Sequence, residues 1–192
     1  MEVFLISNIV LRPMTEEDQE LVMNWRMQPE ITRYMNTDPV LDIEKQKKWF
    51  AKQQADASCY HWIIESDGEP IGVTSITMID KDNRTCTRGT YVAVHEKRSF
   101  EIITSIYASQ FDFIFYDLGL NKIEIQVFEA NKGVVAISKK CGFKQEGLLR
   151  EHVWKNGQVY NVVLLGMTKA DWEEKKKTWQ YQSVEIIVPE RN

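Results

Sequence analysis

The stretch Thr90-Tyr91-Val92-Ala93-Val94-His95-Glu96-Lys97-Arg98-Ser99 decides how this chain folds. Residues 90–94 alternate around small and β-branched side chains, a pattern that favours a strand. A short polar loop follows, and apolar residues then recur with a helical period over residues 99–118. A helix that begins just past a strand end presents free amides and the positive end of its dipole. The stretch therefore predicts an anion-binding site at the start of this helix.

The same order of strand and helix is repeated immediately downstream. Gly119 stands where a helix commonly ends, and residues 122–127 predict a second strand. Residues 131–140 predict a second helix, with Asn131 as its cap and Gly142 closing it. The middle of the chain therefore predicts a strand–helix–strand–helix unit.

Antiparallel strands are expected on both sides of this unit. Upstream, the sequence predicts a short strand over residues 9–12, ended by Pro13, and then a meander of three strands over residues 60–65, 71–79 and 85–94. Downstream, Asn156-Gly157 is a strong hairpin signal between strands at 143–154 and 158–168. The sequence thus predicts a mixed α/β (α+β) fold around a mostly antiparallel sheet of about seven strands.

Helices are expected to flank this sheet, about four in all. Near the N-terminus one helix opens at Thr15 and ends before Pro29, and another runs from Asp42 to about Gln54. A charged helix over residues 169–178 closes the fold. We expect one domain over residues 1–178 and a tail over 179–192, in which residues 184–188 are strand-like.

Charge and composition exclude several classes of protein. A net charge of −4 and a pI near 5.5 argue against nonspecific nucleic-acid binding. The chain has no apolar run near the ~20 residues that cross a membrane, and its start lacks the basic segment of a signal peptide. The three cysteines are scattered, which indicates reduced thiols rather than a metal site. We therefore expect a cytoplasmic protein, a monomer or a homodimer, with no metal.

Several segments taken together resemble one enzyme superfamily. They are Tyr91-Val92-Ala93-Val94 with Arg98, Leu118-Gly119-Leu120-Asn121-Lys122-Ile123, Asn131…Lys140-Cys141-Gly142-Phe143 and Glu146-Gly147-Leu148-Leu149-Arg150-Glu151. In order and spacing over roughly residues 7–175, they are similar to the GNAT superfamily of acetyl-CoA-dependent N-acetyltransferases. The resemblance implies a GNAT fold with a splay between the fourth and fifth strands, and acetyl-CoA as cosubstrate.

Upstream segments narrow the resemblance. They include Trp25-Arg26, Tyr34-Met35-Asn36-Thr37-Asp38, Lys48-Trp49-Phe50 and Trp62-Ile63-Ile64. These look like the enzymes that acetylate UDP-linked 4-amino sugars in pseudaminic acid synthesis. The implied acceptor is the 4-amino group of a UDP-linked amino-deoxy sugar.

The resemblance also implies a binding site for the cosubstrate, with two departures. The residues implied are Tyr91, Val92, Ala93, Val94, Arg98, Ser99, Ile102, Ile103, Thr104, Asn131 and Lys140. The family's loop is rich in glycine, which lets backbone approach phosphate closely, whereas residues 98–104 contain none. Glu101 also adds a negative charge in the first helical turn. A purely structural role, as an amphipathic helix with an acidic start, is the alternative for this segment.

Candidate catalytic residues are Ser138, Glu129 and His61. Ser138 stands where relatives carry a tyrosine that protonates the departing thiolate, and a serine is a poorer acid. The acceptor amine needs a base, for which Glu129 and His61 are candidates beside Glu96 and His95. His61 alternatively is a hydrogen-bonded core residue.

The two N-terminal helices and the loop between them are expected to form a lid over the acceptor. Met35 and Asn36 are implied to contact it, Arg26 offers a guanidinium to a phosphate, and Gln126 is a further candidate. Two other readings stay open. One is an acetyltransferase of protein N-termini or small amines, and the other is a binding module of the same fold that has lost catalysis and binds a partner through residues 184–188.

Overall fold

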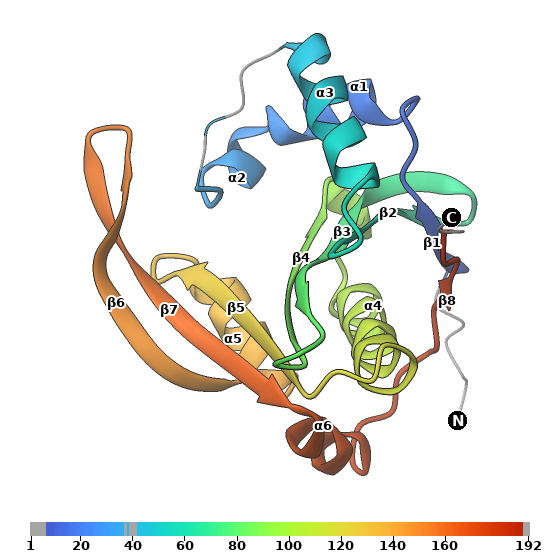
Figure 1. Cartoon of the computed structure of the whole chain (residues 1–192), viewed down its shortest axis with the longest axis vertical. Coiled ribbons are helices and arrows are strands. Elements are labelled where there is room, and N and C mark those ends of the chain that lie inside the picture. The colour runs from blue at the N-terminus through green and yellow to red at the C-terminus, as the bar shows by residue number, and fades with distance from the viewer. Residues whose placement is uncertain (1–6, 37, 39–41, 190–192) are drawn as a thin grey trace.

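One mixed sheet runs through the molecule (Figure 1). The computed structural model describes residues 7–36, 38 and 42–189, and within them the sheet has eight strands in the order β6-β7-β5-β4-β3-β2-β1-β8. The strands are β1 (Ile9–Pro13), β2 (Tyr60–Ser66), β3 (Glu69–Asp80), β4 (Thr85–Val92), β5 (Lys122–Phe128), β6 (Lys144–Lys155), β7 (Gln158–Thr168) and β8 (Glu185–Ile186). Neighbours are antiparallel except for β4 with β5 and β1 with β8. The expected mostly antiparallel sheet is confirmed, with one strand more than expected.

Six α-helices among the described residues flank this sheet, where about four were expected. They are α1 (Gln19–Arg26), α2 (Pro29–Thr32), α3 (Ile43–Gln54), α4 (Phe100–Asp112), α5 (Lys132–Lys140) and α6 (Lys169–Lys176). A 3-10 turn, η1 (His95–Lys97), precedes α4, and a π turn, η2 (Phe113–Asp117), continues it. The helix expected from Thr15 begins instead at Gln19. The Asp18 carboxylate accepts hydrogen bonds from the Thr15 amide and from Arg12, which holds residues 15–18 as a separate turn.

Apolar clusters lie on the two faces of the sheet. Trp62 and Ile64 of β2 pack in the larger cluster with Phe111 and Ile114 from α4 and η2, all fully buried. The smaller cluster joins residues of α1, α2 and α3 to Ile63 of β2. Successive residues of a strand point to opposite faces. The sheet therefore separates α4 from the lid helices α1–α3 (Figure 1).

Strands β4 and β5 pair over only part of their length and then splay apart. They pair in parallel only from Thr85–Thr87 on β4 to Lys122–Glu124 on β5. From there β4 stays with β3, while β5 stays with β7 along its whole length. The splay implied between the fourth and fifth strands is therefore present.

A bulge ends β4 beside this splay. The amides of Ala93 and Val94 both donate to the Ile71 carbonyl, at 2.7 and 3.2 Å. Two amides on one acceptor make the strand bend and turn toward α4. Gly72 permits the close approach, because a Cβ there would lie 2.2 Å from the Tyr91 carbonyl oxygen.

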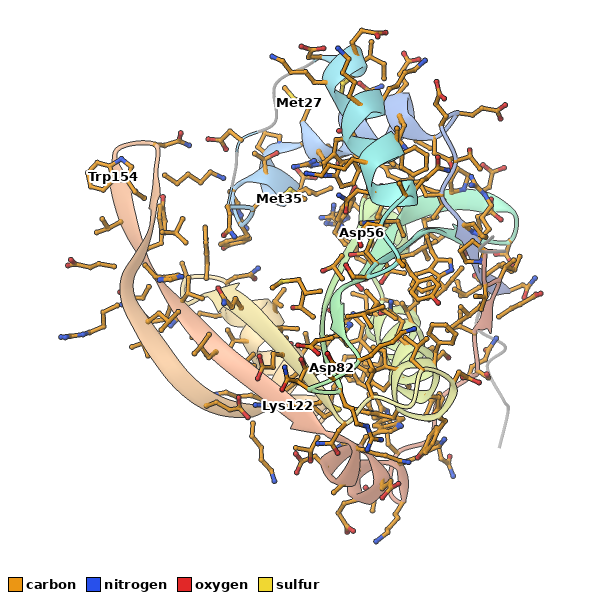
Figure 2. The ribbon with its side chains drawn as sticks, viewed as in Figure 1. Met27, Met35, Asp56, Asp82, Lys122 and Trp154 are labelled. Atoms are coloured by element: carbon orange, nitrogen blue, oxygen red, sulfur yellow. The ribbon has the colours of Figure 1, made fainter. Side chains whose placement is uncertain are left out.

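The hairpin of β6 and β7 forms a long arm beside the splay (Figure 1). It turns at Asn156-Gly157 as the sequence predicted, with both residues at positive φ. Near its tip, Lys155 reaches back to the loop after α2, and Trp154 points outward with 73% of its surface exposed (Figure 2). Lys155 therefore connects the tip of the arm to the lid.

The tail packs onto the domain over its described residues. Val184 is buried and donates its amide to Ser109 on α4, and β8 pairs in parallel with β1. Trp62 donates its indole N–H to the Ile187 carbonyl at 2.8 Å. The strand-like pattern of residues 184–188 thus becomes the eighth strand at the edge of the sheet.

Candidate active site

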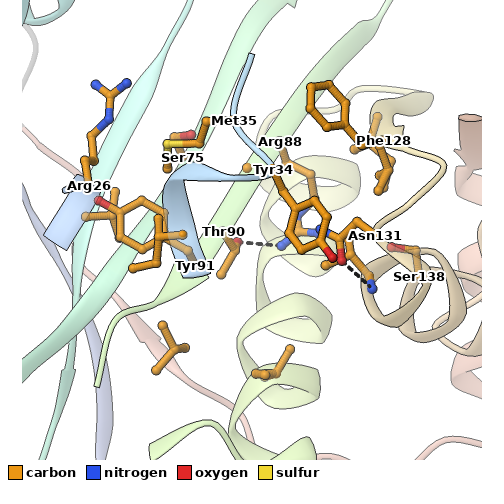
Figure 3. Close-up of a pocket in the computed structure, with 18 of the residues that line it drawn as sticks. Arg26, Tyr34, Met35, Ser75, Arg88, Thr90, Tyr91, Phe128, Asn131 and Ser138 are labelled. Carbon is orange, nitrogen blue, oxygen red and sulfur yellow. Dashed lines mark hydrogen bonds between the residues drawn. The ribbon is translucent and has the colours of Figure 1, made fainter. Parts of the chain in front are cut away.

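A cavity of about 830 Å³ opens where β4 and β5 part. Its walls come from these two strands, the lid, the start of α4 and one face of α5 (Figure 3). Many residues singled out from the sequence line it. They are Arg26, Met35, Asn36, His61, Tyr91, Val92, Arg98, Ile103, Gln126, Asn131 and Ser138.

Other residues singled out from the sequence do not line this cavity. They are Ala93, Val94, Ser99, Ile102, Thr104, Lys140 and Glu129. Ile102 and Thr104 turn into the interior, with 6% and 4% exposure. Lys140 lies on the surface over the ring of Phe100, with its Nζ 4.2 Å from the ring centroid. Periodicity placed Ile102, Thr104 and Lys140 on the correct helices but could not say which helical face meets the cavity.

The start of α4 keeps free amides available although the loop has no glycine. Ser99 is the cap, and its hydroxyl accepts the Ile102 amide at 3.1 Å. Asn131 caps α5 in the same way, accepting from the Val134 amide at 3.4 Å. A helix N-terminus leaves four amides without helical partners, and one cap satisfies only one of them. The remaining amides of α4 suit the diphosphate of CoA.

Arg98 has a structural task that the sequence did not reveal. Its Nε donates to the Val92 carbonyl at 2.7 Å and its Nη2 to the Ala93 carbonyl at 3.1 Å. The same guanidinium lies 3.6 Å from the Glu30 carboxylate on α2. Arg98 therefore fastens the end of β4 to the lid at the mouth of the cavity.

Backbone amides of β4 face the gap in the sheet. Ala93 donates toward β3, so the alternation of a β ladder directs the amides of Thr90 and Val92 the other way. No strand pairs with β4 on that side after Thr87 within the described residues. These amides can donate to a thioester carbonyl or to an amide of the pantetheine arm.

Ser138 is a buried hydroxyl with no partner. It is 0% exposed, lies on α5 and lines the cavity, and its Oγ forms no hydrogen bond within the described residues. Buried hydroxyls are normally paired. An unpaired one at a cavity wall fits a ligand with a polar atom at that point.

His61 lies on β2 at the lid side of the cavity. Its Nε2 is 3.3 Å from Gln53 Oε1, and Trp49 packs edge-on against its ring. Burial lowers the pKa of His61 below its ordinary value of 6.5, opposed by the charge of Asp56. When Nε2–H donates to Gln53, Nδ1 is left to accept a proton. The imidazole is therefore neutral near pH 7 and can serve as a base.

Glu129 lies outside the cavity and is engaged elsewhere. Its carboxylate accepts from Asn161 Nδ2 at 2.9 Å and lies 3.6 Å from Lys132 Nζ. The hydrogen bond from Asn161, followed by the charge of Lys132, holds the pKa of Glu129 below its usual range. A carboxylate stabilised in this way is a weaker base, so the geometry favours His61.

Two cavity-lining residues on the lid side carry a buried polar atom that has no partner in the described part of the chain. Arg26 Nε and the Tyr91 hydroxyl are both buried and form no hydrogen bond in the described ranges. Burial raises the pKa of Tyr91 well above its ordinary value, and the positive charge of Arg26 acts against that rise. Figure 3 shows the Tyr91 hydroxyl pointing toward the Arg26 side of the cavity. A cation beside a neutral hydroxyl donor suits an anionic group.

The charged residues around the cavity are mostly arginines. Arg26, Arg88 and Arg98 line it, against one carboxylate among the described lining residues, Glu30. Sequence reasoning missed Arg88 and gave no role to Glu30, whereas Tyr34 belongs to the stretch that the narrower resemblance had already implied for the lid. One feature of the sequence could have indicated the position of Arg88. It is two residues from Cys86 on the same strand, so the two side chains lie on the same face, and both are buried.

Neither a metal nor a membrane span is suggested by the described residues. They contain no group of three His, Cys, Asp or Glu side chains that could hold a metal ion. No helix among residues 7–36, 38 and 42–189 has the length and apolar character needed to cross a bilayer.

The comparisons with known proteins agree with this geometry. A family model described as an acetyltransferase (GNAT) domain matches residues 8–144. The spermidine N(1)-acetyltransferase of Escherichia coli strain K12 is 24% identical over 182 residues, covering 89% of this chain and 91% of the relative. The acetyltransferase PseH of Campylobacter jejuni is 25% identical over 138 residues, covering 70% and 84%. The crystal structure of a Vibrio cholerae spermidine N-acetyltransferase with CoA and spermine superposes with a TM-score of 0.80 at 20% identity, covering 86% and 98%.

The implied family is confirmed. The narrower resemblance to amino-sugar acetyltransferases is not exclusive, because a spermidine acetyltransferase matches the chain as well. PseH matches a shorter part of the chain than the spermidine enzyme does, at nearly the same identity. The free amides of α4, the gap-facing amides of β4 and the unpaired Ser138 hydroxyl fit CoA. The chain therefore belongs to the GNAT acetyltransferase family and is an N-acetyltransferase that uses acetyl-CoA.

Proposed function

We propose that this enzyme acetylates a primary amine on an acceptor that also carries an anionic group. The best candidate is the 4-amino group of a UDP-linked amino-deoxy sugar. The main observation in support is that two buried groups on the lid side of the cavity, Arg26 Nε and the Tyr91 hydroxyl, have no hydrogen-bond partner among the described residues. A guanidinium and a hydroxyl donor together bind phosphate oxygens.

Other residues that line the cavity suit a sugar. Met35 and Tyr34 offer apolar and aromatic surface to a methyl group or a ring face. Asn36 and Gln126 offer amides that bind hydroxyl groups. A volume of about 830 Å³ also accommodates the pantetheine arm and an acceptor together.

The charge of the cavity supports an anionic acceptor over a polyamine. A polyamine is a multiple cation, and it would meet three arginines and one carboxylate, Glu30, that already faces Arg98 at 3.6 Å. One repulsion between unit charges at ~4 Å costs about 4 kcal/mol at an effective dielectric of 20. A phosphate is an anion, so its interaction with the same arginines is attractive.

The reaction uses residues that face one another across the cavity. The lid holds the acceptor on the side of His61, whose neutral imidazole takes the proton from the amine, directly or through water. The amides of Thr90 and Val92 donate to the carbonyl oxygen as negative charge develops on it. The neutral amine then forms the new amide bond.

A panel of acceptors tests the proposal through release of the CoA thiol. The panel contains UDP-linked amino sugars, spermidine, spermine and short peptides with free N-termini. We expect the UDP-linked amino sugar to have the highest kcat/KM. Arg26→Gln should raise the KM for this acceptor by about tenfold or more while leaving acetyl-CoA affinity unchanged, because the guanidinium contacts only the acceptor.

Glu20→Gln on the exposed face of α1 is the control for a general effect on that helix. Equal activity of Arg26→Gln and wild type on the anionic acceptor would contradict the assignment of Arg26. Failure of every amine, with acetyl-CoA still bound, would favour a binding module without catalysis.

A polyamine remains the second candidate, and one observation favours it. The match to a spermidine acetyltransferase spans 91% of that relative. Glu30 is then the anchor for an ammonium group, after release from Arg98. Spermidine turnover that exceeds sugar turnover and is lost in Glu30→Gln would establish this alternative.

A further inference from the structure

A buried arginine stands where the splay closes. Arg88 follows Thr87, the last residue of β4 that pairs with β5, and it lines the cavity with only 7% of its surface exposed. Its position is fixed by several contacts. Nε donates to Gln110 Oε1 at 3.2 Å, Nη2 donates to Thr90 Oγ1 at 2.6 Å, and Cζ lies 3.7 Å from the ring centroid of Tyr107.

No carboxylate neutralises this guanidinium in the described part of the chain. Its partners are an amide, a hydroxyl and aromatic rings, and it takes part in no ion pair there. Burying an ion without a counter-ion is costly, by several kcal/mol after relaxation. A cation held rigidly under these conditions suits an anion that is present only during a reaction.

The closed end of the gap is the end that the reactive group reaches. The diphosphate part of CoA belongs at the start of α4, by Arg98, where helix amides are free. Val92 and Thr90 lead along β4 from that mouth to Arg88. A linear arm laid along these residues brings its sulfur to the inner end of the cavity, where Ser138 also lies unpaired (Figure 3).

We propose that Arg88 is a catalytic residue that stabilises the departing thiolate of CoA, with Ser138 donating a hydrogen bond to the same sulfur. The amine nitrogen bonds to the acetyl carbon, and the C–S bond breaks with its electron pair on sulfur. The proton lost by the amine goes to His61, so the sulfur leaves as an anion that needs no acid. Arg88 supplies the balancing charge in place of a proton. The proposal holds for any acceptor amine.

The buried cysteines of the protein indicate in which direction Arg88 shifts the pKa of a nearby thiol. Burial raises the pKa of Cys86 to about 12 and that of Cys141 to about 11, and the charge of Arg88 acts against the rise in both. A guanidinium that favours the thiolate form of buried cysteines acts in the same direction on a thiol inside its own cavity.

The test compares the binding of CoA and desulfo-CoA, in which hydrogen replaces the thiol, by calorimetry across pH. For wild type we expect the affinity for CoA relative to desulfo-CoA to rise as the thiol ionises. Each unit by which the site lowers the thiol pKa corresponds to about tenfold in this ratio. Ultraviolet absorbance of the bound thiolate gives the same pKa independently.

Variants then assign the effect to Arg88. In Arg88→Gln the ratio should become independent of pH, while Arg88→Lys should retain part of the dependence because the charge remains. Arg150→Gln, an exposed arginine of β6 outside the cavity, is the charge-matched control and should behave as wild type. We expect Arg88→Gln also to lower kcat about 100-fold, the usual loss for one group that stabilises developing charge.

The wild-type measurement alone can refute the proposal. The test therefore remains decisive even if the Arg88 variants fail to fold. Equal pH dependence for the two ligands in wild type would refute it, as would an unchanged ratio in folded Arg88→Gln. Either result would leave the acceptor assignment untouched, because no acceptor is present. Failure of both ligands to bind wild type would overturn it together with the cofactor site.

Discussion

Lys155 at the tip of the β6–β7 hairpin forms an ion pair with Asp38 in the lid, with 2.9 Å between Lys155 Nζ and Asp38 Oδ1. The lysine side chain is only 6% exposed. It also donates to the carbonyls of Thr32 and Met35, at 2.7 and 2.8 Å. These partners lie about 120 residues from Lys155 in the sequence. The hairpin therefore fixes the loop that carries Met35 and Asn36 above the cavity.

Lys155→Met should destabilise the fold and weaken acceptor binding. The substitution leaves two carbonyls without their donor, which costs about 2 kcal/mol or more when they stay buried. Urea unfolding measures the stability, and steady-state kinetics should show a raised acceptor KM with little change for acetyl-CoA. Lys81→Met, in the exposed turn after β3, is the control and should stay within about 0.5 kcal/mol. An acceptor KM equal to that of wild type would contradict this role of the hairpin.

His61→Gln should remove the acidic limb of the pH–rate profile. Burial lowers the pKa of His61, so the neutral base persists to a pH below 6.5, and activity should fall only below that value. The glutamine variant cannot take up the proton, and kcat should drop about 100-fold. Rate profiles between acidic and mildly alkaline pH check this. A limb that persists unchanged in the variant would assign it to another group.

The same shift has a consequence for stability. Because the unfolded chain protonates His61 more readily than the folded one, wild type should lose stability as pH falls below 6.5. His61→Gln should show a smaller loss over that range. Chemical unfolding at several pH values measures the difference. Parallel curves for the two proteins would mean that His61 has the same pKa folded and unfolded.

Glu101→Gln should tighten the binding of CoA. Glu101 is exposed in the first turn of α4, so its negative charge lies at the helix end proposed for the diphosphate. Solvent screens the repulsion, so an improvement of a few-fold is expected, declining as salt is added. Calorimetry at two salt concentrations measures it. An affinity that does not change would show that the side chain points away from the phosphates.

Gly72→Ala should be strongly destabilising, whereas Gly89→Ala should be tolerated. A Cβ at Gly72 would lie 2.2 Å from the Tyr91 carbonyl oxygen, which forces β3 away from β4 at the bulge. At Gly89 the nearest atom is Ser75 Oγ, at 3.5 Å, an ordinary contact. We expect a loss of about 3 kcal/mol for the first and less than about 1 kcal/mol for the second. Similar unfolding midpoints for the two variants would be inconsistent with this packing.

Glu129→Gln should leave the pH–rate profile of the enzyme as it is. The carboxylate lies outside the cavity and is held by Asn161 and Lys132. A small change in the stability of the turn before α5 is the expected effect. Loss of a limb in the profile of this variant would return Glu129 to the list of candidate bases.

Several elements could be read from the sequence because local interactions decide them. The helical period after Ser99, the caps at Asp42 and Asn131 and the turn at Asn156-Gly157 all appear as expected. In each case the signal lies within a few residues of its effect. The reading failed at Thr15, where Arg12 and the Asp18 side chain formed a turn instead of a helix start.

The sequence by itself thus determined the order of most strands and helices, the family, and the helix start proposed for a diphosphate. Only the tertiary structure decided that, within the described residues, Arg88 lines the cavity without an ion pair and Ser138 lines it without a hydrogen bond, that Glu129 lies outside the cavity, and that Lys155 fixes the lid. The physical reason is the range of the interactions. Periodicity reports neighbours three or four residues apart, whereas the contacts of Lys155 with the lid span about 120 residues.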